Sequence, residues 1–492
     1  MSIDERGLET LSTPDAIGHN ATLNRWSSLP PRWVAGALIG CWPALLLILH
    51  VALTGGEVSA PWMMGWIAVL AACALGGYML TKASGFDVHR LELPGVFAVA
   101  YPIFVMTGVP DMTERHFGAA GADRLPLASV AAYGCVLAGV SVVYSLGTAT
   151  RSRRAMQTSL LQRVVVVLWI IVGLGLLGYY ISYAGTPPLV DLLKGARGTA
   201  LATAREGALV NLSNPLVAYG FNFARLYVLP VAAAALVVHW TRVRTLASGI
   251  AALGLLCIAL LAAALTLEKS PVMRLAVVVG LAVALGSRIR VRLRWSLLAV
   301  LVSACFPVLV ISASNPGSSL SEVLRLFADR IFIDPARVVF FYLDWAPKYS
   351  GGFLGGRLLP FVGSRAGPSV PVTQIISSRI FPNATVQGNA NVAFVGNFWV
   401  DFGWWGVVLG SVFTGCALAC IQRVLDAMRE SALGIAVAAL FAVQVAFLTL
   451  TSVFDSVLSI GLGVLDVLVF AYLWVRTLGP APARTAPNQA PM

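Results

Sequence analysis

Charged residues are scarce in this sequence. Only 11% of its 492 residues are charged, whereas 58% are hydrophobic, and soluble globular proteins carry about 25% charged residues. This composition excludes a water-soluble enzyme of this length. It also excludes an intrinsically disordered chain, because such chains contain too few apolar residues to bury a core.

Cysteine and histidine are also few. The seven cysteines all lie within apolar stretches, where they form neither a disulfide framework nor a zinc site. The polar segments hold no cluster of carboxylates that would bind a metal, so we expect no metal and no cofactor. The sequence also lacks a phosphate-binding loop, a Gly-x-Ser-x-Gly elbow and a His-Glu-x-x-His motif, so it carries no signature of a soluble enzyme.

The chain instead consists mainly of long apolar stretches. Twelve of them predict an all-α polytopic membrane protein, with about 12 transmembrane helices in a membrane domain at 33–475. Polar tails remain at 1–32 and 476–492, and the first lacks the basic and then apolar pattern of a cleaved signal peptide. The twelve stretches lie near 33–53, 61–81, 93–109, 126–148, 164–184, 222–240, 246–267, 272–286, 295–313, 404–421, 431–451 and 456–475.

Lys and Arg residues indicate the orientation. Short cytoplasmic loops of membrane proteins carry an excess of these residues, and here they concentrate in RSRR at 151–154 and SRIRVRLR at 287–294. An arrangement with both termini in the cytoplasm satisfies this rule for every short loop. We therefore assign the net charge of +12 to cytoplasmic loops rather than to nucleic-acid binding.

This orientation leaves two long segments outside, at 185–221 and 314–403. The second opens with Ser319 and Glu322, spaced as a capping box, which predicts a short helix. A further helix is predicted to begin with Asp334 as its cap. The rest is rich in Gly and Pro but also carries aromatic and branched side chains, so we expect an ordered loop that folds back on the membrane domain.

Cationic side chains gather at the predicted outer face. A guanidinium group matches the oxygens of a phosphate, and lysine acts as a point charge, so these residues predict a site for the diphosphate of a lipid-linked substrate. Simpler roles remain open: Arg325 and Arg330 are each spaced to pair with an aspartate four residues later, and Lys269 is able to extend to the interface. The candidates are Arg225 at the mouth of the sixth span, Lys269 and Arg274 beside the turn LEKSPVMRL, Arg330 and Arg337 on the loop helices, and Arg357 in the Gly-rich part.

Removal of a proton from an acceptor hydroxyl requires a base. Asp401, in NFWVDFGWWG where the chain re-enters the membrane, is the first catalytic candidate, and Glu268 is the second. Both have alternatives, because Glu268 stands next to Lys269 as a local pair and the aromatic residues around Asp401 suit an interfacial belt as well as a sugar-stacking wall. Deeper in the membrane, Gln444 and Asp466 suit a structural hydrogen bond or a proton relay.

The segment NANVAFVGNFWVDFGWWGVVLGS at 389–411 resembles the re-entry segment of bacterial oligosaccharide repeat-unit polymerases of the Wzy type. The upstream GGFLGGRLLP, the Arg-bearing loop helices and the two long periplasmic loops fit the same family. The resemblance implies a GT-C-like membrane glycosyltransferase in the bacterial inner membrane. Such an enzyme polymerises undecaprenyl-pyrophosphate-linked oligosaccharide repeat units at the periplasmic face, without a metal. A chain-length-regulating membrane protein is then a candidate partner, beside the lipid bilayer.

By position, the resemblance assigns roles to Arg274, Arg330 and Asp401. The chain departs from the family in two ways: it lacks the Arg-x10-Gly spacing of some polymerase loops, and its long loop lacks the histidine of the related O-antigen ligases. The alternatives are a secondary transporter or lipid-linked glycan flippase, and an O-antigen ligase or another lipid-dependent glycosyltransferase. Long interrupted helices would favour a transporter, but the sequence indicates neither these nor an internal repeat.

Overall fold

The protein is helical throughout the part that the computed structural model describes. Among these residues every regular element is a helix and none is a strand, which confirms the all-α prediction. The structure describes residues 31–54, 59–83, 86, 92–146, 160–183, 186–196, 200, 203–204, 215–286, 305, 308–313, 317–348, 353, 372–382, 390, 392–428 and 431–449.

Six helical stretches are long and apolar enough to cross a bilayer, so the chain is a multi-pass membrane protein. Four shorter apolar helices accompany them, and helices therefore occur at ten of the twelve predicted positions. The predicted span 456–475 and most of 295–313 lie outside the described residues. The six long stretches are Ala60–Lys82, Leu93–Arg115, Ala120–Ser145, Gly220–Val243, Leu246–Ala264 and Phe394–Asp426.

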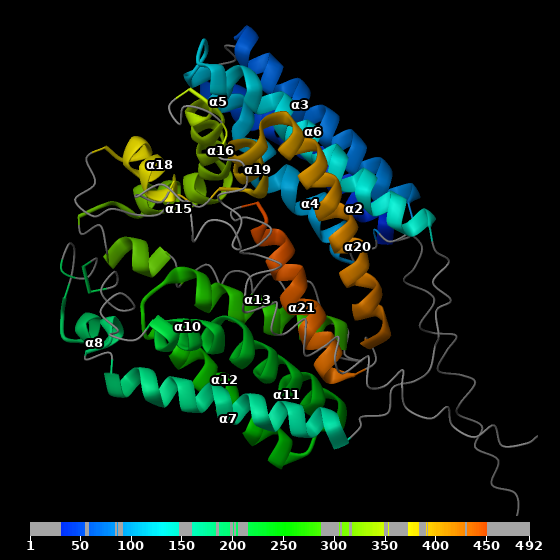
Figure 1. Ribbon diagram of the computed structural model, residues 1–492. Coiled ribbons are helices and arrows are strands. Elements are labelled where there is room, and N and C mark those ends of the chain that lie inside the picture. The colour runs from blue at the N-terminus through cyan, green and yellow to red at the C-terminus, as the bar shows by residue number, and fades with distance from the viewer. Residues whose placement is uncertain are drawn as a thin grey trace, which may run out of the picture.

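One group of helices combines the start of the chain with a late segment (Figure 1). Helix α6 packs along α20 because glycines on both helices allow a close approach: a Cβ atom on Gly139 or Gly415 would overlap with the backbone of the other helix. The members of this group are α2 (Pro31–Thr54), α3 (Ala60–Lys82), α4 (Leu93–Phe104), α5 (Val109–Arg115), α6 (Ala120–Ser145) and α20 (Ser411–Met428).

The middle of the chain forms a second group (Figure 1). Its long helices pack around α11, whose residues Leu229 to Ala235 are all buried. The members of this group are α7 (Leu160–Tyr183), α8 (Pro188–Leu193), α10 (Pro215–Phe223), the π-helix η4 (Ala224–Val228), α11 (Leu229–Val243), α12 (Leu246–Ala264) and α13 (Lys269–Gly286).

Helix α21 (Ala432–Phe447) lies between the two groups (Figure 1). It contacts α11 and α13 on one side and α4 and α20 on the other. Every residue from Leu433 to Val445 is buried, so α21 is covered by protein on all of its faces.

The second long loop supplies helices that pack beside α5 and α6. Helix α15 (Leu320–Phe332) begins with the predicted capping box, in which Ser319 and Glu322 exchange hydrogen bonds. Helix α16 (Asp334–Trp345) follows after one residue and packs on α6 and α19 (Phe394–Trp405). A further short helix, α18 (Val372–Ile380), packs on α16.

One prediction about this loop is wrong. Asp334 is not the cap of α16: it is the first helical residue, Ile333 holds the cap position, and no side chain caps this end. The chain passes from α15 into α16 without an extended residue, so the geometry that a capping aspartate requires is absent there. Near the end of this loop, helix α19 begins at Phe394 and places Asp401 on a helix.

Several long stretches are interrupted, although the sequence did not indicate broken helices. The stretch Leu93–Arg115 contains a 3-10 turn at Met106–Gly108, which follows Pro102. The stretch Phe394–Asp426 bends at Gly403, whose φ is +60°, and then forms the π-helix η5 (Gly406–Gly410). Proline and glycine are the usual causes of such breaks, but a single apolar run does not show whether one of them bends the helix.

The α6–α20 contact yields a prediction. We expect Gly415→Val to lower the unfolding free energy by about 1–3 kcal/mol, because the new side chain would overlap with the backbone of Val136. Thermal unfolding of the purified protein in detergent measures this effect. The matched control is Gly280→Val on α13, where a Cβ atom meets nothing within 4 Å. Equal stability of the two variants would contradict the close contact.

Candidate functional site

The candidate site begins at the π-helical turn that carries Arg225. Pro230 lies at the second position of α11 and has no backbone N–H, so the carbonyl of Leu226 lacks its ordinary helical partner. The chain widens into the π-helix η4 over Ala224–Val228 just before this proline. Single π-turns within helices often occur at functional sites.

Arg225 is almost fully buried, with 1% of its surface exposed. Its Nε atom donates to Asn222 Oδ1 at 2.8 Å, and its Nη1 atom donates to the hydroxyl of Thr266. Its Nη2 atom lies 2.5 Å from Glu268 Oε2 and forms an ion pair. The guanidinium also stands over the ring of Phe221, at 5.3 Å from its centroid.

The turn between α12 and α13 supplies two of these partners. Leu267 has a positive φ of 51°, and this conformation turns the chain between Thr266 and Glu268. Helix α8 packs on the same turn, where Leu189 N donates to Leu265 O at 3.1 Å. Two predicted site residues therefore bind each other: Glu268 pairs with Arg225 across 43 positions in the sequence.

Arg274 lies next to this ion pair, on α13. It is buried, and its guanidinium carbon lies 4.7 Å from the ring centroid of Phe447 and 5.7 Å from that of Tyr227. It also makes a side-chain hydrogen bond with Tyr227 and is close enough to Arg225 to interact with its charge. Arg274 thus occupies the point where α13, η4 and the end of α21 meet.

The end of α21 also connects this point to the re-entry segment. Phe394 N, at the start of α19, donates to Leu448 O at 3.4 Å, directly after Phe447. Asp401 lies two turns further along α19 and is buried, with 2% of its surface exposed. The bend at Gly403 follows at once, and a Cβ atom there would overlap with the ring of Phe353.

Sequence reasoning missed Arg124, which lies in the first turns of α6. Its guanidinium carbon lies 5.3 Å from the ring centroid of Trp399, and its Nη1 atom donates to Leu343 O at 3.3 Å. Trp399 in turn donates to Ala346 O at 2.9 Å. An arginine at the predicted outer end of a span, where the Lys and Arg bias disfavours it, was the signal that could have identified this residue.

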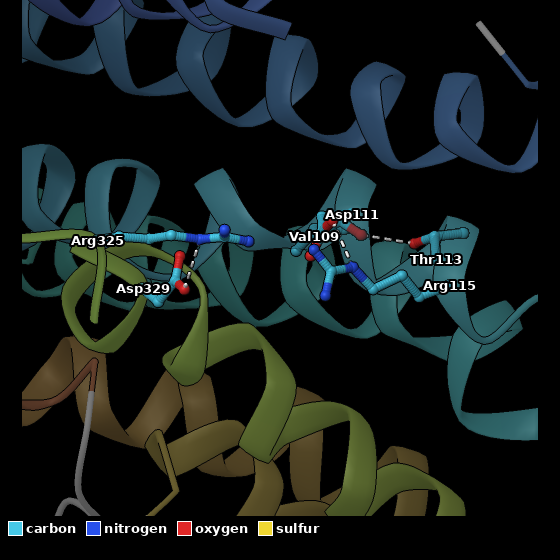
Figure 2. Close-up of polar contacts among 6 residues, drawn as sticks. All are labelled: Val109, Asp111, Thr113, Arg115, Arg325 and Asp329. Carbon is cyan, nitrogen blue, oxygen red and sulfur yellow. Dashed lines mark hydrogen bonds and ion pairs between the residues drawn. The ribbon is translucent and has the colours of Figure 1, made fainter. Parts of the chain in front are cut away.

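Helix α5 and the loop helices α15 and α16 carry surface charges that are largely paired. Asp111 and Arg115 on α5 lie 2.7 Å apart, and the expected pair Arg325–Asp329 on α15 is present at 3.9 Å (Figure 2). Asp334 pairs with Arg337 at 3.9 Å rather than with Arg330. Burial raises the pKa of Asp334, although Arg330 and Arg337 both act to lower it.

The site residues predicted from the sequence therefore lie in different parts of the structure. Arg225, Glu268 and Arg274 come together, whereas Arg330 is exposed on α15. Arg337 on α16 donates to Ile380 O at 3.2 Å. Arg357, Asp466 and the side chain of Lys269 lie outside the described residues. Among the residues that the structure describes, no group of three or more His, Cys, Asp or Glu side chains forms a metal-binding cluster.

Comparisons with known proteins add no family to this description. No family model, no curated protein and no solved structure matches the chain. The case for a function therefore depends on the geometry above and on the chemistry of its residues.

The Arg225–Glu268 pair yields a prediction about stability. Removing one member of a buried pair leaves the other charge uncompensated, which costs about 3–5 kcal/mol when both groups are fully buried. Because the Glu268 side chain is 37% exposed, we expect a loss near or below the lower end of that range for Glu268→Leu. Thermal unfolding in detergent measures the loss. The double variant Arg225→Leu with Glu268→Leu should recover part of it, and a strictly additive double variant would contradict the pairing.

His116 yields a prediction about pH. Its ring stacks on Phe340 of α16 at 4.3 Å, and burial, with help from Arg337 and Arg115, lowers its pKa below the ordinary 6.5, although Asp111 and Asp344 oppose this. The folded protein therefore favours the neutral ring, so stability is lost as the pH falls from about 6.5 through the lowered value. We expect His116→Phe to reduce this loss, as measured by thermal unfolding at pH values on both sides of 6.5. An unchanged dependence of stability on pH in this variant would contradict the role of His116.

Proposed function

We propose that this protein polymerises undecaprenyl-pyrophosphate-linked oligosaccharide repeat units at the periplasmic face of the bacterial inner membrane. The growing glycan is transferred from its lipid carrier to the free end of an incoming unit. The proposal is supported by the multi-pass helical fold, by the packed helices of the second long loop and by the cluster around Arg274.

The position of Arg274 carries the proposal. A charged side chain within an apolar helical bundle is costly and usually functional. Arg274 is buried, and its guanidinium lies over the aromatic faces of Tyr227 and Phe447. A diphosphate leaving group develops negative charge as the glycosidic bond breaks, and a cation fixed at that point stabilises the charge without reorganisation.

The acceptor hydroxyl transfers its proton to a carboxylate while its oxygen attacks the anomeric carbon and the bond to the diphosphate breaks. Glu268 is the better placed of the two candidates, because it is partly exposed and lies beside the Arg274 cluster. Asp401 is buried and precedes the bend of α19 at Gly403. We assign Asp401 to positioning the re-entry segment, so the order of the two candidates is reversed relative to the sequence analysis.

A secondary transporter is the second candidate, and the interrupted helices favour it. Transporters commonly bind their substrates at discontinuous helices near the middle of the membrane. Here the stretches Leu93–Arg115, Gly220–Val243 and Phe394–Asp426 all contain a 3-10 or π-helical turn. The two functions differ in a simple way, because only a polymerase makes longer glycans from a lipid-linked unit in detergent.

We expect Arg274→Ala to abolish glycan elongation, because the leaving diphosphate loses its fixed cation. The loss of one electrostatic donor typically lowers the rate by about 100- to 1,000-fold. The measurement uses the purified protein in detergent, a lipid-linked oligosaccharide unit and a gel that resolves chain length. Arg274→Lys should retain part of the activity, because a point charge replaces the planar guanidinium.

The matched control is Arg115→Ala. Arg115 lies in an exposed pair with Asp111, and such pairs contribute little to stability, so this variant should elongate like the native protein. Normal chain ladders from a folded Arg274→Ala variant would disprove the role of Arg274. No elongation by the native protein, together with transport of the same unit across vesicles, would favour the transporter.

A further inference from the structure

Helix α15 of the second long loop has two chemically different faces. Four of its apolar residues recur at spacings of four, three and four, so these four share one side of the helix. The opposite side carries Glu322, Arg325 and Asp329, with Leu326, which is 41% exposed, at its edge. The apolar side is formed by Leu320, Leu324, Phe327 and Ile331.

The start of the apolar face is not covered by the described part of the protein. Leu320 is 68% exposed and Leu324 is 48% exposed, whereas Phe327 and Ile331 are half-buried. A single exposed leucine is ordinary on a protein surface. Two exposed leucines on the same face of one amphipathic helix indicate an apolar surface that contacts another apolar surface or lipid.

Both ends of α15 are held close to the membrane spans. Phe332 stacks near Trp42 of α2 and Phe104 of α4, each at 6.3 Å between ring centroids. The backbone at the end of α15 lies against Gly108, within the stretch Leu93–Arg115. At the other end, Ser319 follows the helical residues 308–313 after only five positions, a reach of at most about 20 Å.

The two faces of α15 have different neighbours. The polar face turns toward α5, where Asp329 is close enough to Asp111 to interact with its charge (Figure 2). The apolar face, on the opposite side, points away from α5. Helix α2, which Phe332 contacts, presents Leu45 and Ile48 outward, at 54% and 66% exposure. Phe332 thus joins the end of α15 to a membrane helix whose outward side chains are apolar.

We propose that α15 is an interfacial helix that lies in the outer leaflet, with Leu320 and Leu324 inserted at the boundary between headgroups and acyl chains. Amphipathic helices with basic side chains bind anionic lipid surfaces in this way. The Arg325 side chain is 83% exposed, and together with Arg330 it lies at the level of the phosphate groups. The occupant of the apolar face is phospholipid, and this holds whether the protein polymerises or transports glycans.

Site-specific photocrosslinking of the full-length protein tests this assignment. Benzoylphenylalanine replaces Leu324, and the protein is reconstituted into nanodiscs of phosphatidylethanolamine and phosphatidylglycerol. Irradiation should then add the mass of a phospholipid, with a yield close to that of Ile48, an exposed position of α2. The same probe at Asp329, on the polar face, should give a lipid yield several-fold lower.

A second probe at Leu320 keeps the test valid if the variant at Leu324 fails to fold, which thermal unfolding reveals. Lipid adducts at either leucine, above the level at Asp329, support the proposal. A crosslinked dimer, or crosslinks only within the protein, would overturn it in favour of a protein partner on this face. An absence of lipid adducts at both leucines, while Ile48 is labelled, would overturn it as well.

Discussion

The burial of helix α21 is the constraint on which the two helix groups depend. Its residues from Leu433 to Val445 are all covered, and packing against α11 and α13 as well as α4 and α20 holds the groups in one arrangement. An apolar helix gains little from the hydrophobic effect within lipid, so its association depends on close packing and polar contacts. Because Phe447 contacts Arg274 and the next residue, Leu448, binds the start of α19, the position of α21 determines that of the candidate site.

The sequence predicts the elements of this fold better than their interruptions. Apolar runs located ten helices, and the spacing of Ser319 and Glu322 identified a capping box that the structure confirms, since both signals are local. The bend at Gly403 and the π-turn at Ala224–Val228 were not predicted. Both features depend on the neighbouring helices that each helix packs against, and the hydropathy of one segment does not identify those neighbours.

The residues of the candidate site could likewise be predicted better than their contacts. The sequence identified Arg225, Glu268 and Arg274 as unusual because charges are rare in apolar stretches. It offered Lys269 as the partner of Glu268, whereas the structure pairs Glu268 with Arg225, because the fold brings together residues that are far apart in the chain. Arg124 was not predicted. Its contact with Trp399 shows that a cation at the start of a span is also a candidate site residue.

The π-helix at Ala224–Val228 has a consequence for how this site tolerates changes in chain length. A π-turn accommodates one residue more than an α-turn over the same rise. Deleting one residue within it would restore a regular helix, and because the wide turn holds the extra residue, the helical segments on either side would keep their positions. Asn222 and Phe221 would then stay in place, whereas the turn that carries Arg225 would narrow, so the deletion would disturb the charge network rather than the membrane span.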